Sequence, residues 1–181
     1  MAQQVDFTRI DEDVVTRASQ VLDLLCRRGM SVVTAESCTG GLIATVLSEA
    51  PGANEHLHGG FVVYTKPNKT AALGVPADVL AREGAVCRTV VCAMAEGALQ
   101  RSPADVAVAI TGVAGPEPDD DGNPVGLVHL AVARRGFPPL HEVRNFGDVG
   151  RAAVRYRAVM AALELLKRVL RYEGRATSTI G

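Results

Sequence analysis

The sequence predicts an α/β fold: a three-layer α/β/α sandwich around a mostly parallel mixed sheet of about five strands. Two patterns carry this prediction. Apolar residues at helical spacing alternate with short β-branched runs along most of the chain, which is typical of a parallel sheet covered by helices. Towards the C-terminal end two strand-like segments follow one another directly, which predicts a hairpin and therefore one antiparallel strand.

The first half of the chain alternates helix and strand. Gly29 follows the first helical pattern directly, as expected for a residue that ends a helix. The run "SVVTA" is short, apolar and β-branched, which predicts a buried strand. The expected elements are a helix at 12–28, a strand at 31–35, a helix from 40 to just before Pro51, a strand at 59–65 and a helix at 67–73.

The second half contains the central strand and the hairpin. The run "DVAVAIT" is continuously apolar after its first residue, which is typical of a strand covered on both faces. The expected elements are helices at 76–84 and 88–102, strands at 105–111, 125–133 and 140–146, a Gly/Pro/Asp loop at 112–124 and a closing helix from 150 to about 172. Residues 1–181 are expected to form one domain, with loose tails at 1–10 and 173–181.

The composition indicates whether nucleic acid, a membrane or a metal is to be expected as a partner. The chain has 181 residues, 19 Lys and Arg against 20 Asp and Glu, and a net charge of −1, whereas nucleic-acid binders usually carry a basic face. No apolar stretch approaches the roughly 20 residues that span a bilayer. The four cysteines form no CxxC pair and no export signal is evident, which predicts reduced thiols, no zinc site and a cytoplasmic protein. We therefore expect no nucleic-acid partner, no membrane and no metal.

Three loops are expected to meet at one edge of the sheet. They are "AESCTGG" at 35–41, "YTKPNK" at 64–69 and "TGVAGP" at 111–116, each directly after a predicted strand. In open α/β sheets, ligands bind beyond the carboxyl ends of the strands. This edge is therefore the predicted functional site.

The first loop, "AESCTGG", has three interpretations. It could bind an anion, because it opens a helix whose N–H groups are free and because Gly40 and Gly41 allow a ligand close to the backbone. It could present Ser37 as a nucleophile. It could also be a simple cap, with Ser37 or Thr39 bonding the helix start. The local pattern leaves the cap and the functional interpretations equally open.

The other loops supply groups that could activate a serine. Serine needs a base to take its proton, and a buried lysine with a lowered pKa could do so, with Tyr64 as a relay. The alternative is that the lysines of 64–69 are solvated.

The acidic run 119–121 lacks the spacing of a calcium loop and is expected to be solvated. His56 and His58 are expected to be surface residues, and Arg151 at a helix start hints at an anionic contact.

Taken together, the motifs "TAESCTGG", "GGFVVYTKPNK" and "AITGVAGP" followed by "PVGLV" resemble the CinA C-terminal domain family, the nicotinamide-nucleotide amidase family, over about residues 12–172. The resemblance implies the same three-layer fold. It implies hydrolysis of nicotinamide mononucleotide to nicotinate mononucleotide and ammonia in pyridine nucleotide recycling, with no cofactor. It also implies a homodimer. The alternatives are a non-catalytic nucleotide-binding module and a competence- or damage-inducible accessory protein.

The resemblance also assigns residues. It makes Ser37 the nucleophile, assisted by Tyr64 and Lys69, which keep the spacing of the family pattern Y-S-N-x-x-K, while Thr65 and Lys66 depart from it. Backbone groups near Ser37 or in "TGVAG" would hold the oxyanion. The residues expected to bind substrate or oxyanion are Glu36, Cys38, Thr39, Gly40, Gly41, Thr111, Gly112, Gly115 and Arg151.

Overall fold

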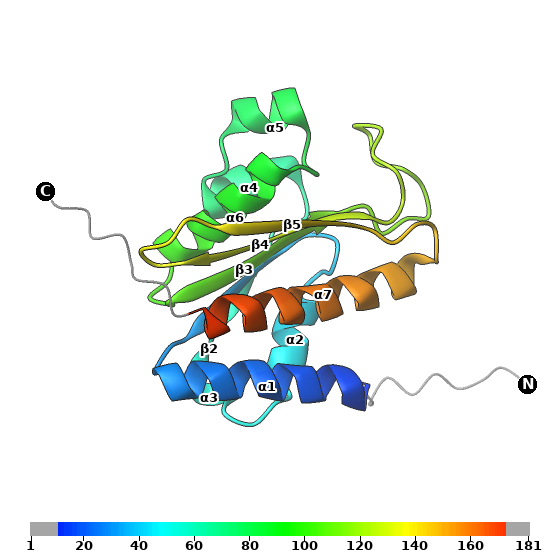
Figure 1. The fold of residues 1–181 in the computed structure, drawn as a ribbon. Coiled ribbons are helices and arrows are strands. Elements are labelled where there is room, and N and C mark those ends of the chain that lie inside the picture. The colour runs from blue at the N-terminus through cyan, green and yellow to red at the C-terminus, as the bar shows by residue number, and fades with distance from the viewer. Residues whose placement is uncertain (1–10, 173–181) are drawn as a thin grey trace, which may run out of the picture.

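A five-stranded sheet organises the structure, a computed structural model that describes residues 11–172 (Figure 1). The strands are β1 (Val32–Glu36), β2 (Leu57–Val62), β3 (Val106–Gly112), β4 (Leu127–Arg134) and β5 (Leu140–Asn145), in the spatial order β2-β1-β3-β4-β5. β1 pairs in parallel with β2 and β3, and β4 is antiparallel to both β3 and β5. Within residues 11–172 only β4 runs in the opposite direction, so the prediction of a mostly parallel mixed sheet is confirmed.

Seven helices in the described residues surround this sheet. They are α1 (Glu12–Arg28), α2 (Leu42–Ser48), α3 (Ala53–His56), α4 (Lys66–Leu73), α5 (Ala77–Glu83), α6 (Arg88–Gln100) and α7 (Arg151–Arg171). α4, α5 and α6 lie on one side of the sheet, whereas α2 and α7 lie on the other with α1 packed outside α7 (Figure 1). The three layers agree with the predicted sandwich. The expected loose tails lie outside the described residues.

The central strand β3 is buried on both faces, as its continuous apolar run predicts. Val108 and Ile110 face the core beneath α7, while Ala107 and Ala109 face the core beneath α6. Burying a side chain of valine or isoleucine size stabilises a fold by about 1.5–3 kcal/mol. The alanines leave room for α6 to pack close to the strands.

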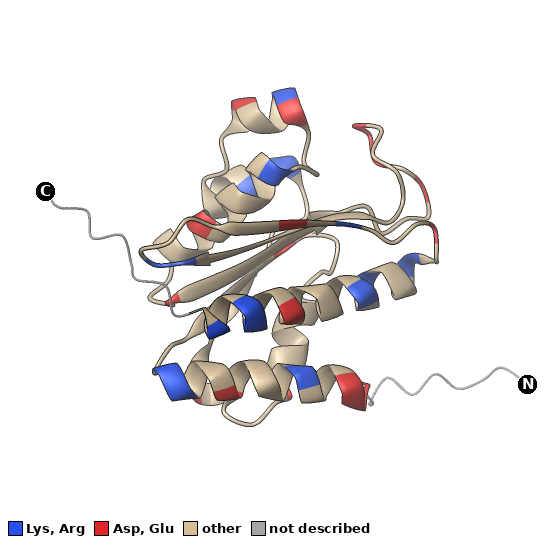
Figure 2. Ribbon diagram, in the orientation of Figure 1, with Lys and Arg blue, Asp and Glu red and all other residues tan. Residues whose placement is uncertain are grey.

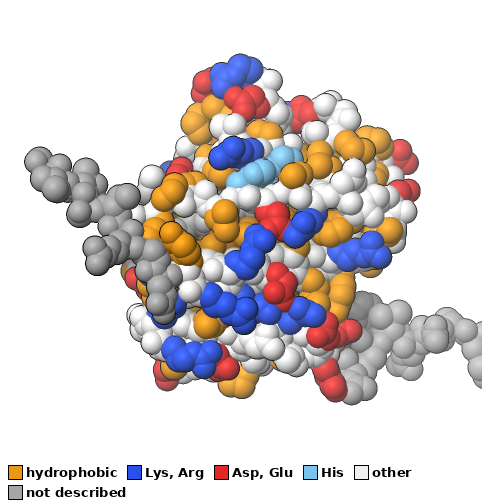
Figure 3. Space-filling view, viewed as in Figure 1, with side chains coloured by type: hydrophobic (Ala, Val, Ile, Leu, Met, Phe, Trp, Pro, Cys, Tyr) orange, Lys and Arg blue, Asp and Glu red, His pale blue; other side chains and the backbone are white. Residues whose placement is uncertain are grey.

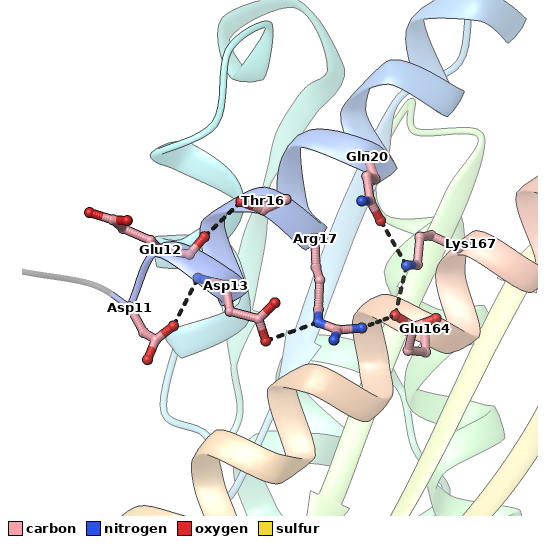
Figure 4. A network of polar contacts seen from close by, with 8 residues as sticks. All are labelled: Asp11, Glu12, Asp13, Thr16, Arg17, Gln20, Glu164 and Lys167. Carbon is pink, nitrogen blue, oxygen red and sulfur yellow. Dashed lines mark hydrogen bonds and ion pairs between the residues drawn. The ribbon is translucent and has the colours of Figure 1, made fainter.

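Polar contacts join the first helix to the last. Arg17 of α1 bonds Glu164 of α7 at 2.5 Å, and Glu164 also pairs with Lys167 at 2.6 Å (Figure 4). The Lys167 ammonium in turn donates to Gln20 Oε1 at 2.9 Å. Lys167 is only 6% exposed, so its charge depends on these partners. The network therefore fixes the outer helix α1 on α7.

A glycine sets the position of α4, the helix that carries Lys69. A Cβ at Gly97 of α6 would lie 2.0 Å from the Leu73 carbonyl oxygen at the end of α4. No real Cβ atom approaches a backbone oxygen so closely. The absence of a side chain at Gly97 is therefore what allows α4 to pack against α6.

The structure corrects two details of the prediction. The strand expected at 59–65 occupies Leu57–Val62, because the chain leaves the sheet edge before Thr65, whose hydroxyl caps α4. The short helix α3 was not expected, and it holds His56, whose Nδ1 bonds the Met30 carbonyl at 2.9 Å. None of the helices in residues 11–172 is long and apolar enough to cross a membrane.

Candidate active site

The strand ends bring the predicted loops together at one edge of the sheet. β1, β2 and β3 lie side by side and parallel, so the segments that follow them emerge at the same edge. Two hydrogen bonds continue the ladder beyond the strands: Ser37 N–H donates to the Ile110 carbonyl at 3.1 Å, and Val63 N–H donates to the Glu36 carbonyl at 2.8 Å. The backbone on either side of Ser37 is therefore fixed by both neighbouring strands.

Ser37 and Lys69 are in direct contact. The Lys69 ammonium donates to Ser37 Oγ at 2.9 Å and to the Val63 carbonyl at 2.7 Å. Lys69 is 1% exposed and Ser37 is 7% exposed. Ser37 directly follows β1, whereas Lys69 lies in α4, 32 residues further along the chain. A distance of this size is the one expected between a nucleophile and its base.

Burial changes the acid–base chemistry of Lys69. Removal from water disfavours the ammonium and lowers the pKa of Lys69 from 10.5 to about 8, against a smaller opposing effect from Cys38. With a pKa of about 8, roughly a tenth of the Lys69 side chains are neutral at pH 7. At the ordinary lysine pKa the neutral fraction is negligible. The neutral amine is a base that is able to accept the Ser37 proton.

Cys38, the neighbour of the serine, is a protonated thiol. Burial raises the pKa of Cys38 to about 11, although the Lys69 charge opposes this effect. Because the thiolate is the reactive form of cysteine, Cys38 is not the nucleophile at neutral pH. Ser37 is the side chain of this turn that is in contact with the Lys69 amine.

Glu36 has a structural role that the sequence did not reveal. Its carboxylate is fully buried and accepts five hydrogen bonds, from the hydroxyls of Thr34 and Thr39 and from the backbone N–H groups of Gly41, Ile43 and Ala44. The acid thereby caps α2 and complements the positive end of its dipole.

This cap corrects the expectation of an anion site at the start of α2. The carboxylate of Glu36 already accepts from Gly41 N–H, and Gly40 N–H bonds the Ser37 carbonyl at 3.0 Å. Neither the predicted cap residue Thr39 nor these glycines line the cavity described below. The interpretation of Thr39 as the direct cap is wrong too, because its hydroxyl bonds Glu36 at 2.7 Å.

Two backbone donors remain beside the serine. In the described part of the chain, the N–H groups of Cys38 and Thr39 donate to no other residue. Cys38 also lines the cavity next to Ser37. An N–H group directly after a nucleophile is a frequent member of an oxyanion hole. The Cys38 N–H is therefore the best candidate for that role.

Tyr64 and Arg151 close the other side of the site. Arg151 donates through Nη2 to the Tyr64 hydroxyl at 3.0 Å and through Nη1 to the Gly115 carbonyl at 2.7 Å. Tyr64 is 57% exposed, unlike the buried serine and lysine. Nearby, Thr111 Oγ1 donates to the Ala85 carbonyl at 2.9 Å, so its hydroxyl holds a neighbouring segment in place.

A cavity of about 480 Å³ lies against the Ser37–Lys69 pair. Its volume falls in the range of small-molecule sites. The predicted site residues that it brings together are Ser37, Cys38, Tyr64, Lys69, Thr111, Gly112, Gly115 and Arg151. The predicted residues outside its lining are Glu36, Thr39, Gly40 and Gly41.

The acidic loop was missed as part of this cavity. As expected, the loop is exposed to solvent at Asp120 and Asp121, and these side chains also line the cavity together with Asp119 and Lys66. Lys66 pairs with Asp121 at 2.7 Å, across 55 residues of sequence. The only hint in the sequence was that Lys66 departs from the family pattern. No group of three or more His, Cys, Asp or Glu side chains in residues 11–172 is arranged to hold a metal ion.

Known proteins share this sequence and this fold. The sequence model of the CinA C-terminal domain family matches residues 15–170 of this chain. A CinA-like protein of Prochlorococcus marinus is 46% identical over 153 residues, and one of Gloeobacter violaceus is 42% identical over 158 residues. The matches cover 84% and 87% of this chain but only 36% and 37% of those proteins. The chain thus spans less than two fifths of the length of these relatives.

Solved structures agree with the sequence comparison. The competence/damage inducible protein CihA from Agrobacterium tumefaciens superposes with a TM-score of 0.86 and is 42% identical, over 92% of this chain and all of that chain. The competence damage-inducible protein A from Klebsiella pneumoniae gives a TM-score of 0.85 at 33% identity, over 89% of this chain and 99% of that one. By sequence and by fold, this chain belongs to the CinA C-terminal domain family.

Proposed function

We propose that the chain is an amidase that hydrolyses the carboxamide of nicotinamide mononucleotide to nicotinate mononucleotide and ammonia. The observation that carries the proposal is the contact of 2.9 Å between Ser37 Oγ and the Lys69 amine, at a cavity of small-molecule size. This pair supports a reaction with a serine nucleophile, and both the carboxamide and the nucleotide are proposed from the family resemblance. The proposed setting is pyridine nucleotide recycling.

The first half of the reaction forms an ester. Neutral Lys69 takes the hydroxyl proton of Ser37 while Oγ bonds to the carboxamide carbon, and the carbonyl oxygen becomes an oxyanion. The Cys38 N–H would donate to that oxyanion. Losing one such donor typically costs about 3–4 kcal/mol of transition-state stabilisation. The Lys69 ammonium then returns its proton to the nitrogen, the C–N bond breaks and ammonia leaves.

The second half of the reaction consumes water. Lys69, neutral again, takes a proton from a water molecule whose oxygen bonds to the ester carbon. The ester C–O bond breaks, Ser37 regains its proton and the carboxylate product is released. Tyr64 is exposed at the cavity and held by Arg151, so in this scheme it orients the substrate or relays a proton at the solvent side.

Ammonia release tests the proposal directly. The full chain is incubated with nicotinamide mononucleotide, and ammonia and the product acid are measured. We expect release from the wild type, none above background from Ser37→Ala, and wild-type release from the control Ser48→Ala, whose hydroxyl bonds only a neighbouring turn of α2. Nucleotide binding without ammonia would instead identify a non-catalytic binding module, and full release from Ser37→Ala would exclude this serine as nucleophile.

The expected partners remain predictions. On the face drawn in Figure 3, basic and acidic side chains are interspersed over the surface instead of gathering in one basic patch. The expectation of no nucleic-acid partner rests on the net charge of −1 and stays a prediction. For the expected homodimer, the edge strand β5 is the first surface to test, because Leu140 and Val143 are 44% and 49% exposed there. Light scattering after size-exclusion chromatography would give the oligomeric state.

A further inference from the structure

Lys66 and Asp121 join two segments that the sheet does not connect. Lys66 begins α4, and Asp121 lies in the loop between β3 and β4, in which Figure 2 shows the acidic positions. The Lys66 ammonium contacts Asp121 Oδ1 at 2.7 Å and holds the pKa of that carboxyl below its ordinary value. An isolated exposed ion pair contributes little to stability. Here, however, the pair has additional contacts.

The Asp121 carboxylate also ties down a third segment. Its Oδ2 accepts a hydrogen bond from Ala85 N–H at 3.1 Å. The backbone leaves room for this oxygen, since a Cβ at Gly84 would lie 2.7 Å from it and Gly84 has a φ of 76°. One carboxylate therefore links α4, the segment after α5 and the acidic loop.

The loop itself is held in shape independently of this link. Asp119 accepts hydrogen bonds from Asp121 N–H at 3.1 Å, from Asn123 N–H at 2.7 Å and from Asn123 Nδ2 at 2.9 Å. At the base of the loop, Arg151 bonds the Gly115 carbonyl. The tip is thus a folded unit that Asp121 fastens to Lys66.

The link lies beside the reacting groups without touching them. Lys66, Ala85 and Asp121 line the same cavity as Ser37. Lys66 is one helical turn before Lys69 on α4, but within residues 11–172 no hydrogen bond or ion pair joins its side chain to Ser37 or Lys69. A loss of the link would free one wall of the cavity while leaving the Ser37–Lys69 contact intact.

We propose that Lys66 and Asp121 form a clasp that holds the loop 115–124 against α4 as a wall of the substrate cavity, and that they are positioning residues for substrate binding rather than for the chemical step. The kinetic part of this inference rests on the proposed amidase function. The structural part, a wall closed by the clasp, does not.

Hydrogen–deuterium exchange tests the clasp in the free protein. We expect Lys66→Gln and Asp121→Asn each to raise the exchange rate of amides in 84–86 and 117–123, without changing exchange in α1 or α7. Lys66→Arg retains the ion pair and should exchange like the wild type. The matched control is Arg144→Gln, which removes an ion pair with Glu142 on β5, and neither residue lines the cavity. Unchanged exchange in both clasp variants would overturn the proposal.

Amidase kinetics test what the clasp does. The KM for nicotinamide mononucleotide should rise about threefold to fivefold in Lys66→Gln, the range that one exposed ion pair supports, with kcat within about twofold of wild type. Lys66→Arg should restore the KM. The double variant Lys66→Gln/Asp121→Asn should be no worse than the worse single variant, because the two residues act through each other.

The outcomes separate the two proposals. Additive effects in the double variant, or a loss of kcat at unchanged KM, would overturn the clasp as a positioning device. If the wild type released no ammonia, the amidase proposal would fail. Calorimetric affinity for the nucleotide would then replace KM, and the exchange experiment would still decide whether the clasp closes the wall.

Discussion

Replacing Lys69 with methionine should abolish ammonia release and yet remove a cost from the folded state. The lysine is buried with its pKa lowered from 10.5 to about 8. Between these two values the folded protein binds fewer protons at this site than the unfolded chain does. The free energy of unfolding of the wild type therefore rises with pH from about 8 to 10.5, and the full cost is present below pH 8.

The size of the effect follows from the shift. A lowering of the Lys69 pKa from 10.5 to about 8 corresponds to about 3 kcal/mol at pH 7. Methionine avoids this cost, but it leaves the Val63 carbonyl without its donor, which costs about 1–3 kcal/mol. At pH 7 the variant should therefore be more stable than the wild type by about 1 kcal/mol.

The dependence on pH is the sharper measurement, because the lost hydrogen bond affects all pH values alike. Urea unfolding of wild type and Lys69→Met is measured from pH 7 to pH 10. Relative to the variant, the wild type should gain about 2 kcal/mol between pH 8 and pH 10. Ser37→Ala keeps the lysine and serves as the control, so its profile should run parallel to wild type. Parallel profiles of wild type and Lys69→Met would refute the lowered pKa.

Three further predictions concern the site and its support. The kcat/KM for ammonia release should rise with pH and level off above about pH 8, as neutral Lys69 becomes the major form, which a pH series of initial rates measures. Glu36→Gln should destabilise the fold by about 2–3 kcal/mol in urea, because hydrogen bonds to a charged group are lost or weakened. Gly97→Ala should lower both the melting temperature and kcat, because its Cβ would displace Leu73 and thus α4.

Each of these three predictions has an outcome that would contradict it. A kcat/KM that is flat from pH 6 to pH 9 would exclude a base with the pKa of Lys69. Wild-type stability in Glu36→Gln would show that the charge of the cap is not needed. A Gly97→Ala protein with normal kcat would show that α4 tolerates the shift without moving Lys69.

Most of the fold could be predicted from the sequence, because the spacing of apolar residues matches the side chains that are buried in nearly every helix and strand. The continuous apolar run predicted β3 as a strand covered on both faces, and the structure has it one residue later, at Val106–Gly112. The helix α3 was missed because its four residues are too few to show a helical period. The end of β2 was misplaced because the apolar, aromatic run continues past the point where the chain leaves the sheet.

The site was predicted in part. Loops after parallel neighbouring strands must meet, so Ser37 and Lys69 could be placed at one edge from topology and family spacing. The direction of a buried side chain is a property of the packed structure, and for that reason Glu36 was expected to face substrate when it faces α2. The clasp of Lys66 and Asp121 depends on the path of an irregular loop, which no periodicity encodes.

The buried Glu36 carboxylate means that the turn carrying Ser37 is ordered before any ligand binds. The turn that carries Ser37 is shaped by hydrogen bonds to Glu36 that form when the chain folds. The ordering of the reactive turn is then complete before any ligand arrives, so none of the substrate's interaction energy is consumed in arranging it. If the proposed amidase function holds, small carboxamides that lack the ribose phosphate should find the serine in the same arrangement as the full nucleotide does.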